Sequence, residues 1–122
     1  MSSSRHDHPI DPQRVARARA RLPAADDVAR LTGQLSVLAD PVRLRLVYAL
    51  DVADELCVGD LALALDATED AVSYALRLLR AAGLVVTRKA GRVVYNRLAE
   101  DFPAPLREHC LRQLVALSRT AD

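Results

Sequence analysis

The chain has 122 residues, of which 51% are hydrophobic and 3% aromatic, and its net charge is +1. This length and apolar content suit one folded domain and exclude extensive disorder, and so few aromatic side chains exclude a stacking platform for single-stranded nucleic acid. Apolar runs fall short of the roughly 20 residues that span a membrane, and the N-terminal MSSSRHDHPIDPQR lacks the apolar centre of a signal peptide. We therefore expect a cytoplasmic protein with no membrane association, whose two cysteines are free thiols or ligands rather than a disulfide.

Charge is divided unevenly along the middle of the chain. Residues 51–70 contain seven acidic residues and no Lys or Arg, whereas residues 71–97 contain six basic residues and no acid. Such a division gives a nearly neutral protein one basic face and one acidic edge. For any single charged residue, an ordinary solvated surface is the alternative.

The first elements expected in chain order are a polar tail and two helices. Residues 1–10 are polar, and residues 11–21 are helix-prone but poor in large apolar side chains, so this helix needs a partner to persist. Residues 25–39 have the period of an amphipathic helix, whose apolar stripe is formed by Val28, Leu31, Leu35 and Leu38.

A further helix begins at ADPVRLRLVYAL, because Asp40 is a good N-cap and Pro41 a good first helical residue. We expect Leu44, Val47 and Tyr48 to face inward. The next two segments form a pair: a short helix over residues 58–66, and a second helix that Thr68 caps and Gly83 ends. The second helix has a buried stripe and a wet polar face, formed respectively by Val72, Leu76 and Leu79 and by Ser73, Tyr74, Arg77 and Arg80.

The apolar period then changes to two in LVVTRKAGRVVYNRL, which predicts a β-hairpin turning at Ala90–Gly91. A last helix is expected over about residues 103–119, with an apolar stripe of Leu106, Cys110, Leu114 and Leu117. We divide the chain into a tail with a marginal helix (1–24), a central domain (25–102) and a C-terminal helix (103–122).

A short helix, a turn, a second helix and a basic-tipped hairpin follow one another in the order of a winged helix-turn-helix, a mainly α fold with a β-hairpin wing. The second helix of such a pair fits the major groove, and long basic side chains on the hairpin reach phosphates. Residues 25–102 are therefore expected to be a DNA-binding domain. The candidate DNA contacts are Ser73, Tyr74, Arg77, Arg88, Lys89, Arg92 and Thr68.

Four segments, LSVLADPVRLRLVYAL, ELCVGDLALAL, DAVSYALRLLRAAGLV and RKAGRVVYNRL, together resemble the ArsR/SmtB family of metal-responsive repressors over about residues 31–98. The resemblance implies a homodimeric winged-helix protein, dimerised through its C-terminal helix, that binds operator DNA and releases it when metal binds. The ELCVGD segment is similar to the thiol-containing metal box of the family's zinc, cadmium and lead sensors.

The metal hypothesis centres on Cys57 and Asp60, which are three residues apart and supply a thiolate and a carboxylate suited to Zn²⁺, Cd²⁺ or Pb²⁺. The resemblance suggests that the N-terminal segment of one protomer reaches this box in the other, where His6 or His8 would complete the site. The alternatives are a packed small thiol for Cys57, a helix N-terminal charge for Asp60 and a solvated tail for the histidines.

The chain departs from the family pattern in three places, which bear on its effector, its operator and the family's second metal site. Many arsenic and cadmium sensors have a second cysteine where this chain has Gly59, which argues against arsenite as the effector. The family often has His in place of Tyr74, so the preferred operator can differ. The family's second metal site, between C-terminal helices, is expected to be absent because Phe102, Gln113 and Ala116 replace its ligands.

Other classes of function remain as alternatives. A thiol-redox or persulfide sensor would use Cys57 with Cys110, and a regulator without an effector would use neither. A protein-interaction module would lack salt-sensitive DNA binding. An enzyme is excluded on inventory, since the sequence shows only three His, no nucleophile with a nearby base, no Gly-rich phosphate loop and no paired acids in a pocket-forming pattern.

Overall fold

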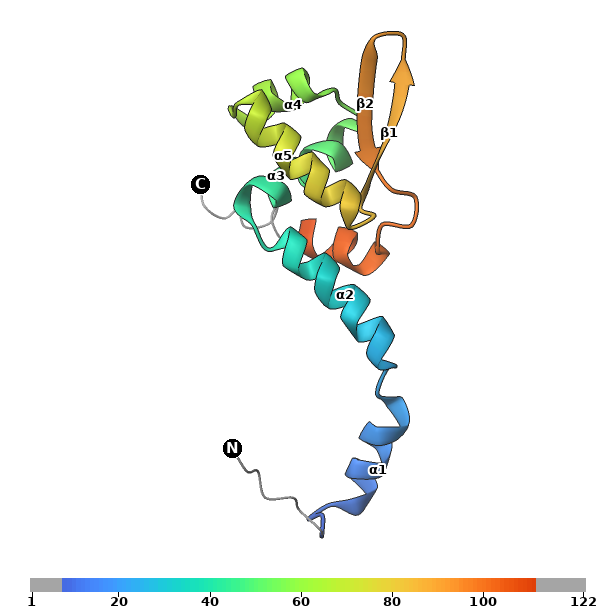
Figure 1. Ribbon diagram of the computed structural model, residues 1–122. Coiled ribbons are helices and arrows are strands. Elements are labelled where there is room, and N and C mark those ends of the chain that lie inside the picture. Colours follow the sequence, from blue (N-terminus) through green and yellow to red (C-terminus); the bar gives the residue numbers. More distant parts are fainter. Residues whose placement is uncertain (1–7, 112–122) are drawn as a thin grey trace. The chain divides into compact units, whose positions relative to one another are not determined.

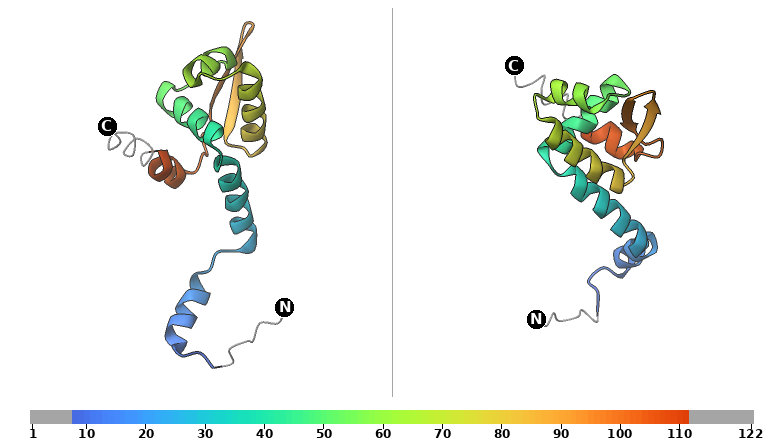
Figure 2. Two further views of the ribbon diagram at one scale, coloured as in Figure 1. Left: turned by 90° about the vertical axis from the view of Figure 1, so that its left-hand side faces the viewer. Right: turned by 45° about the horizontal axis from the view of Figure 1, so that its top comes forward.

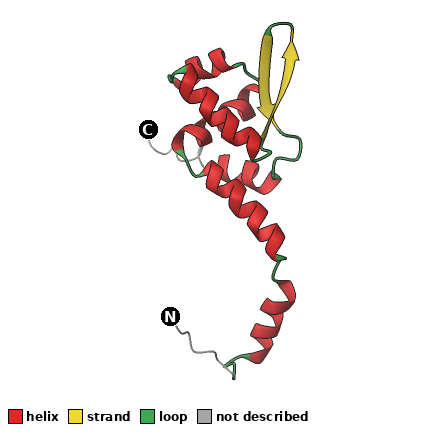
Figure 3. Ribbon diagram, in the orientation of Figure 1, coloured by secondary structure: helices red, strands yellow, loops and turns green. Residues whose placement is uncertain are grey.

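The computed structural model describes residues 8–111, apart from the side chains of residues 109 and 110. The chain divides into two units, residues 1–31 and residues 32–122. Among the described residues, no helix is long and apolar enough to cross a membrane. The elements, shown in Figures 1 and 3, are helices α1 (Pro12–Arg21), α2 (Ala25–Leu38), α3 (Pro41–Ala53), α4 (Val58–Leu65) and α5 (Glu69–Ala81), strands β1 (Val85–Ala90) and β2 (Val93–Leu98), and a π-helical segment, η1 (Leu106–Leu111).

Helix α1 is set by its local sequence. The Asp11 carboxylate accepts a hydrogen bond from the backbone N–H of Arg14 at 3.0 Å, and Pro12 occupies the first turn, where its missing N–H costs nothing. No residue of α1 is buried. The expected helix is therefore present, and among the described residues its cap is the clearest support for it.

The core of the second unit is built from α3, α4, α5 and the hairpin. Helix α3 contacts α4, α5 and β2, while α5 contacts α4 and β1. Figure 2 shows the three helices grouped beside the hairpin. Leu44 and Tyr48, which were expected to face inward, are partly buried against this core. The apolar side chains with 0–1% exposure are Leu46, Val47, Leu50, Leu61, Val72, Leu76, Leu79 and Leu84.

Both ends of α5 are fixed by the residues predicted to fix them. The Thr68 hydroxyl accepts a hydrogen bond from the N–H of Ala71 at 3.1 Å. At the other end Gly83 has a φ of 74°, a left-handed value that glycine adopts without steric cost. Leu84 N–H donates to the Leu79 carbonyl at 3.0 Å, which completes a Schellman-type end.

The hairpin is antiparallel, with a register from Val85 opposite Leu98 to Ala90 opposite Val93. Its two-residue loop is Gly91–Arg92, one residue later than expected. Gly91, with a φ of 63°, takes the first loop position, because a tight hairpin turn requires a positive φ there.

The C-terminal part of the described chain differs from the α-helix expected over residues 103–119. Leu106–Leu111 forms i to i+5 hydrogen bonds of the π type, so Leu106 and Leu111, five apart, both pack on the core. The expected α-helix instead placed Leu106 and Cys110, four residues apart, on the same apolar face. The remaining residues of the expected stripe, and the side chain of Cys110, lie outside the described residues.

Candidate nucleic-acid interface and thiol site

The outer face of α5 is polar and accessible. Ser73, Tyr74 and Arg77 are exposed on the side away from the buried stripe, as predicted. The Arg77 guanidinium lies 5.7 Å from the centroid of the Tyr74 ring, and this cation–π contact holds the two side chains together. Thr68 is also exposed, but its hydroxyl oxygen already accepts the capping hydrogen bond. The arrangement offers a tyrosine and an arginine as one polar unit.

The start of α5 carries negative charge instead. Glu69 and Asp70 occupy its first turn, where they stabilise the positive end of the helix dipole. The same carboxylates repel DNA phosphates. Arg77 lies two turns further along α5, so the part of the polar face around Arg77 is the part suited to contact the anionic DNA backbone.

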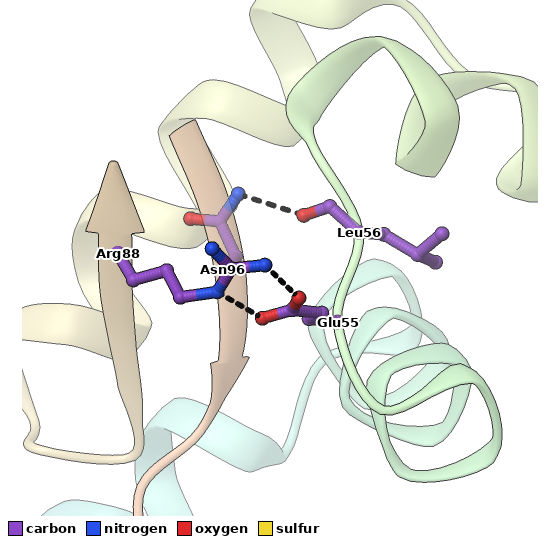
Figure 4. A network of polar contacts seen from close by, with 4 residues as sticks. All are labelled: Glu55, Leu56, Arg88 and Asn96. Atoms are coloured by element: carbon purple, nitrogen blue, oxygen red, sulfur yellow. Dashed lines mark hydrogen bonds and ion pairs between the residues drawn. The ribbon is translucent and has the colours of Figure 1, made fainter. Parts of the chain in front are cut away.

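The three wing residues predicted to contact DNA are not equivalent. Lys89 and Arg92 are exposed, and neither makes an ion pair or a side-chain hydrogen bond within the described part of the chain. Arg88 by contrast donates to both carboxylate oxygens of Glu55, with Nε to Oε2 at 2.9 Å, and its guanidinium lies 4.7 Å from the Tyr95 ring centroid. Arg88, predicted as a DNA contact, is thus already engaged in the free protein (Figure 4).

This pairing shifts the titration of both groups. The hydrogen bond from Arg88 is the main factor that lowers the pKa of the Glu55 carboxyl, aided by the positive charges of Arg88 and Arg97 and opposed by burial. The same hydrogen bond raises the pKa of Arg88 above its ordinary value. The side chains of Glu55 and Arg88 are 29% and 49% exposed, so the pair is partly open to solvent.

Cys57 is a free cysteine at the N-cap of α4, and it is half-buried. This position normally favours Ser, Thr, Asp or Asn, whose oxygens cap the helix. The Cys57 side chain makes no capping hydrogen bond, although its carbonyl accepts from Leu61 N–H at 2.9 Å. Asp60 is exposed in the first turn of α4. The thiol therefore does not act as the side-chain cap of α4.

The histidines predicted as further metal ligands belong to the first unit of the chain, whereas Cys57 belongs to the second. His8 is exposed in the unit formed by residues 1–31, and His6 lies outside the described residues. Across the residues that the structure describes, no group of three or more His, Cys, Asp or Glu side chains could hold a metal ion. A four-ligand site therefore stays a prediction.

Two residues important to this region were not singled out by sequence reasoning. Glu55 was counted only as one of several acids, and Asn96 was read only as part of a strand. Asn96 is 1% exposed, and its side-chain Nδ2 donates to the Leu56 carbonyl at 3.1 Å. The one available signal was a polar residue within an otherwise apolar strand pattern, because a buried amide needs a partner.

A helix pair whose second helix exposes a polar face, followed by a basic two-stranded wing, defines the class of winged helix-turn-helix proteins. Residues 40–87 match the family described as bacterial regulatory protein, arsR family. The chain is 43% identical over 89 residues to a transcriptional repressor SmtB homolog of Synechocystis, covering 73% of this chain and 67% of that protein. The chain belongs to the arsR family of bacterial regulatory proteins.

Two further comparisons agree with this assignment. The cadmium resistance transcriptional regulatory protein CadC of Listeria innocua is 38% identical over 86 residues, which are 70% of this chain and 71% of that protein. The crystal structure of the AntR antimony-specific transcriptional repressor is 28% identical, covers 82% of this chain and 86% of its own, and superposes with a TM-score of 0.66. The winged-helix fold expected from the sequence is thereby confirmed.

Proposed function

We propose that this protein is a cytoplasmic transcriptional repressor that binds operator double-stranded DNA as a homodimer and leaves it when a thiophilic divalent metal binds at Cys57. The observation that carries the metal part is the position of the Cys57 thiol, which lies at the start of the helix-turn-helix and is not used as a cap. The names of the relatives, a repressor and a cadmium resistance regulator, support the same reading. The function is binding and release, with no catalytic step.

DNA binding is assigned to α5 and the wing. Helix α5 enters the major groove with Ser73, Tyr74 and Arg77 toward the base edges and the adjacent backbone, while Lys89 and Arg92 reach phosphates. Each phosphate that a basic side chain neutralises contributes about −0.9 to the slope of log K against log salt. Thr68 is the weakest of these contacts because its hydroxyl caps α5.

A homodimer accounts for apolar surface that one chain leaves open. On α2, Val28, Leu31 and Leu35 are 46%, 44% and 42% exposed. Exposing such a row of apolar side chains to water is unfavourable, so a partner that covers it stabilises the protein. A two-fold dimer also spaces two recognition helices for half-sites about one helical turn apart. We assign the C-terminal helix to the same interface.

The metal site then draws on both protomers. Cys57 and Asp60 supply sulfur and oxygen, and His6 or His8 from the other protomer supplies nitrogen, a donor set that suits Zn²⁺, Cd²⁺ or Pb²⁺. For metal to release the DNA, it need only bind more tightly to the dimer conformation of low DNA affinity than to the conformation of high DNA affinity. A coupling of about 1–3 kcal/mol, typical of allosteric proteins, lowers operator affinity roughly 5- to 150-fold.

The decisive variant is Cys57→Ser, with Cys110→Ser as the matched control. Metal-free reduced protein is titrated with Zn²⁺, Cd²⁺ and Pb²⁺ while thiolate charge-transfer absorption is followed, and binding to a duplex selected from a random-sequence pool is measured by fluorescence anisotropy. We expect Cys57→Ser to bind the duplex but to show neither the absorption nor the release, and Cys110→Ser to behave as wild type.

Two outcomes would overturn the metal proposal. Release of Cys57→Ser by the same metals would place the site elsewhere. Release by an oxidant or a persulfide donor that requires both cysteines, with no response to metal, would establish the thiol-sensing alternative.

The remaining ligands are tested with two further variants, one that removes both histidines and one that replaces Asp60. We expect the double variant His6→Ala/His8→Ala to bind Cd²⁺ at least tenfold more weakly, and Asp60→Asn to do the same, because loss of a residue that only orients a ligand already costs about 10- to 100-fold in metal affinity. An unchanged Cd²⁺ affinity in Asp60→Asn would leave Asp60 as a helix N-terminal charge only.

A further inference from the structure

The residues between α3 and α4 that precede the thiol form a strap, defined here as residues 55–57, along the edge of the wing. Leu56 N–H donates to the Asn96 carbonyl at 3.1 Å, and Asn96 N–H donates back to the Leu56 carbonyl at 2.9 Å. The buried Asn96 amide adds its own hydrogen bond to the same carbonyl (Figure 4). The strap is therefore joined to β2 by three hydrogen bonds, and its last residue is Cys57.

A second link joins the strap to the other wing strand. Arg88 lies on β1 opposite Tyr95 on β2, and its guanidinium lies over the Tyr95 ring and ends on the Glu55 carboxylate. Figure 4 shows the guanidinium and the carboxylate face to face. The Glu55–Arg88 ion pair and the three hydrogen bonds between Leu56 and Asn96 thus join the strap to both strands in one network.

We propose that Glu55 withholds Arg88 from the DNA backbone, so that the strap holds the wing in a state of low DNA affinity. A carboxylate and a phosphate are alternative acceptors for the same pair of guanidinium N–H groups, and one guanidinium presents that pair to only one of them at a time. Lys89 and Arg92, which have no such partner among the described residues, serve as the unconditional phosphate contacts. Glu55 is a positioning residue in this scheme, because it acts through Arg88.

This inference rests on the DNA binding proposed above, and its regulatory half rests on the proposed role of Cys57. Because Cys57 is two residues from Glu55 in a strap bonded to β2, a ligand on its thiol that fixes the strap favours the state in which Glu55 keeps Arg88. By linkage, a ligand that prefers this state weakens DNA binding.

The test is a double-mutant cycle in metal-free reduced protein, read as duplex affinity over a range of KCl concentrations. We expect Glu55→Gln to tighten binding about two- to fivefold, the range of an exposed ion pair, and to steepen the log K against log salt slope by up to about 0.9. The gain must vanish when Glu55→Gln is added to Arg88→Gln. Glu100→Gln, which removes an exposed charge just after β2, is the matched control and should leave the slope unchanged. Thermal melts confirm that each variant is folded.

Three results would overturn the proposal. Weaker or unchanged binding by Glu55→Gln would mean that the ion pair only shapes the wing. If Glu100→Gln tightened DNA binding equally, or if Glu55→Gln still tightened it when combined with Arg88→Gln, the effect would come from the protein's overall charge rather than from the ion pair.

The regulatory half is tested with Cd²⁺ alone as the probe. We expect Glu55→Gln to keep the thiolate absorption but to lose at least half of the fold-change in DNA affinity that Cd²⁺ causes in wild type. An equal fold-change in both proteins would show that the strap does not carry the signal. If Cd²⁺ binds neither protein, the proposed effector fails, while the metal-free cycle still decides the role of Glu55.

Discussion

Helices α5 and α2 have the same kind of apolar stripe and different surroundings. In α5, Val72 and Leu76 are 0% exposed, because α3, α4 and β1 pack against that helix. In α2, Leu31 and Leu35 are 44% and 42% exposed, and only Leu38 at its end is buried, at 7%. Periodicity therefore predicts a helix with an apolar face, but it does not say whether the partner of that face lies in the same chain.

The difference separates two sources of stability. The face of α5 stabilises the folded unit of one chain, and we assign the face of α2 to assembly with a second copy. Substitutions of equal size on the two helices should then affect different quantities, namely the free energy of unfolding and the dissociation constant of the dimer.

The largest effect is expected from Leu76→Ala in the core. Truncating a fully buried leucine removes its transfer free energy and leaves a cavity, so we expect the free energy of unfolding to fall by about 3 kcal/mol. Urea denaturation at fixed protein concentration measures this change. Leu63→Ala on α4, where the side chain is 81% exposed, is the control and should change stability by less than about 0.5 kcal/mol. Equal losses in the two variants would contradict the assignment of the core.

A smaller and different effect is expected from Leu35→Ala on α2. Because a two-fold interface contains this side chain twice, we expect the dimer dissociation constant to rise about tenfold, which is about 1.4 kcal/mol. Sedimentation equilibrium measures it. Leu22→Ala, at an exposed leucine outside the stripe, should leave the constant unchanged. If Leu35→Ala associates as tightly as wild type, α2 is not the dimer interface.

The sequence predicted the elements and most of their ends, because those signals are local. Asp40 and Thr68 each cap a helix through an N–H three residues on, and Gly83 adopts the positive φ that ends α5. The polar face with Ser73 and Tyr74 followed from the same period that buries Val72 and Leu76. The expected α geometry near Leu106 was wrong, because π-type hydrogen bonds cannot be read from apolar spacing.

The contacts that tie the thiol segment to the wing could not be predicted. Glu55 and Arg88 are 33 positions apart, and Leu56 and Asn96 are 40 positions apart. No periodic pattern connects them, since their proximity depends on the hairpin register and on the path of the chain between α3 and α4. For the metal site, the sequence offered donor types, but the described residues leave the assembly of His6 and His8 with Cys57 untested.

The smallest effects on stability are expected from removing the N-terminal caps of α5 and α1. They compare a helix that has buried residues with one that has none. The Thr68 hydroxyl and the Asp11 carboxylate make equivalent hydrogen bonds, at 3.1 Å and 3.0 Å, to the N–H three residues on. We expect Thr68→Ala to lower the free energy of unfolding by about 1 kcal/mol, because α5 is part of the core and a cap contributes about that much. Thr68→Ser should restore it, since serine keeps the hydroxyl.

Asp11→Ala should instead leave the urea midpoint unchanged and lower only the helical circular dichroism contributed by α1, because no residue of α1 is buried. Urea denaturation followed by circular dichroism reads both quantities in one experiment. A fall of about 1 kcal/mol in Asp11→Ala as well, the full contribution of a cap, would show that α1 unfolds together with the core. A loss that appears only at concentrations where the dimer forms would mean that α1 is stabilised by the second copy rather than by its own chain.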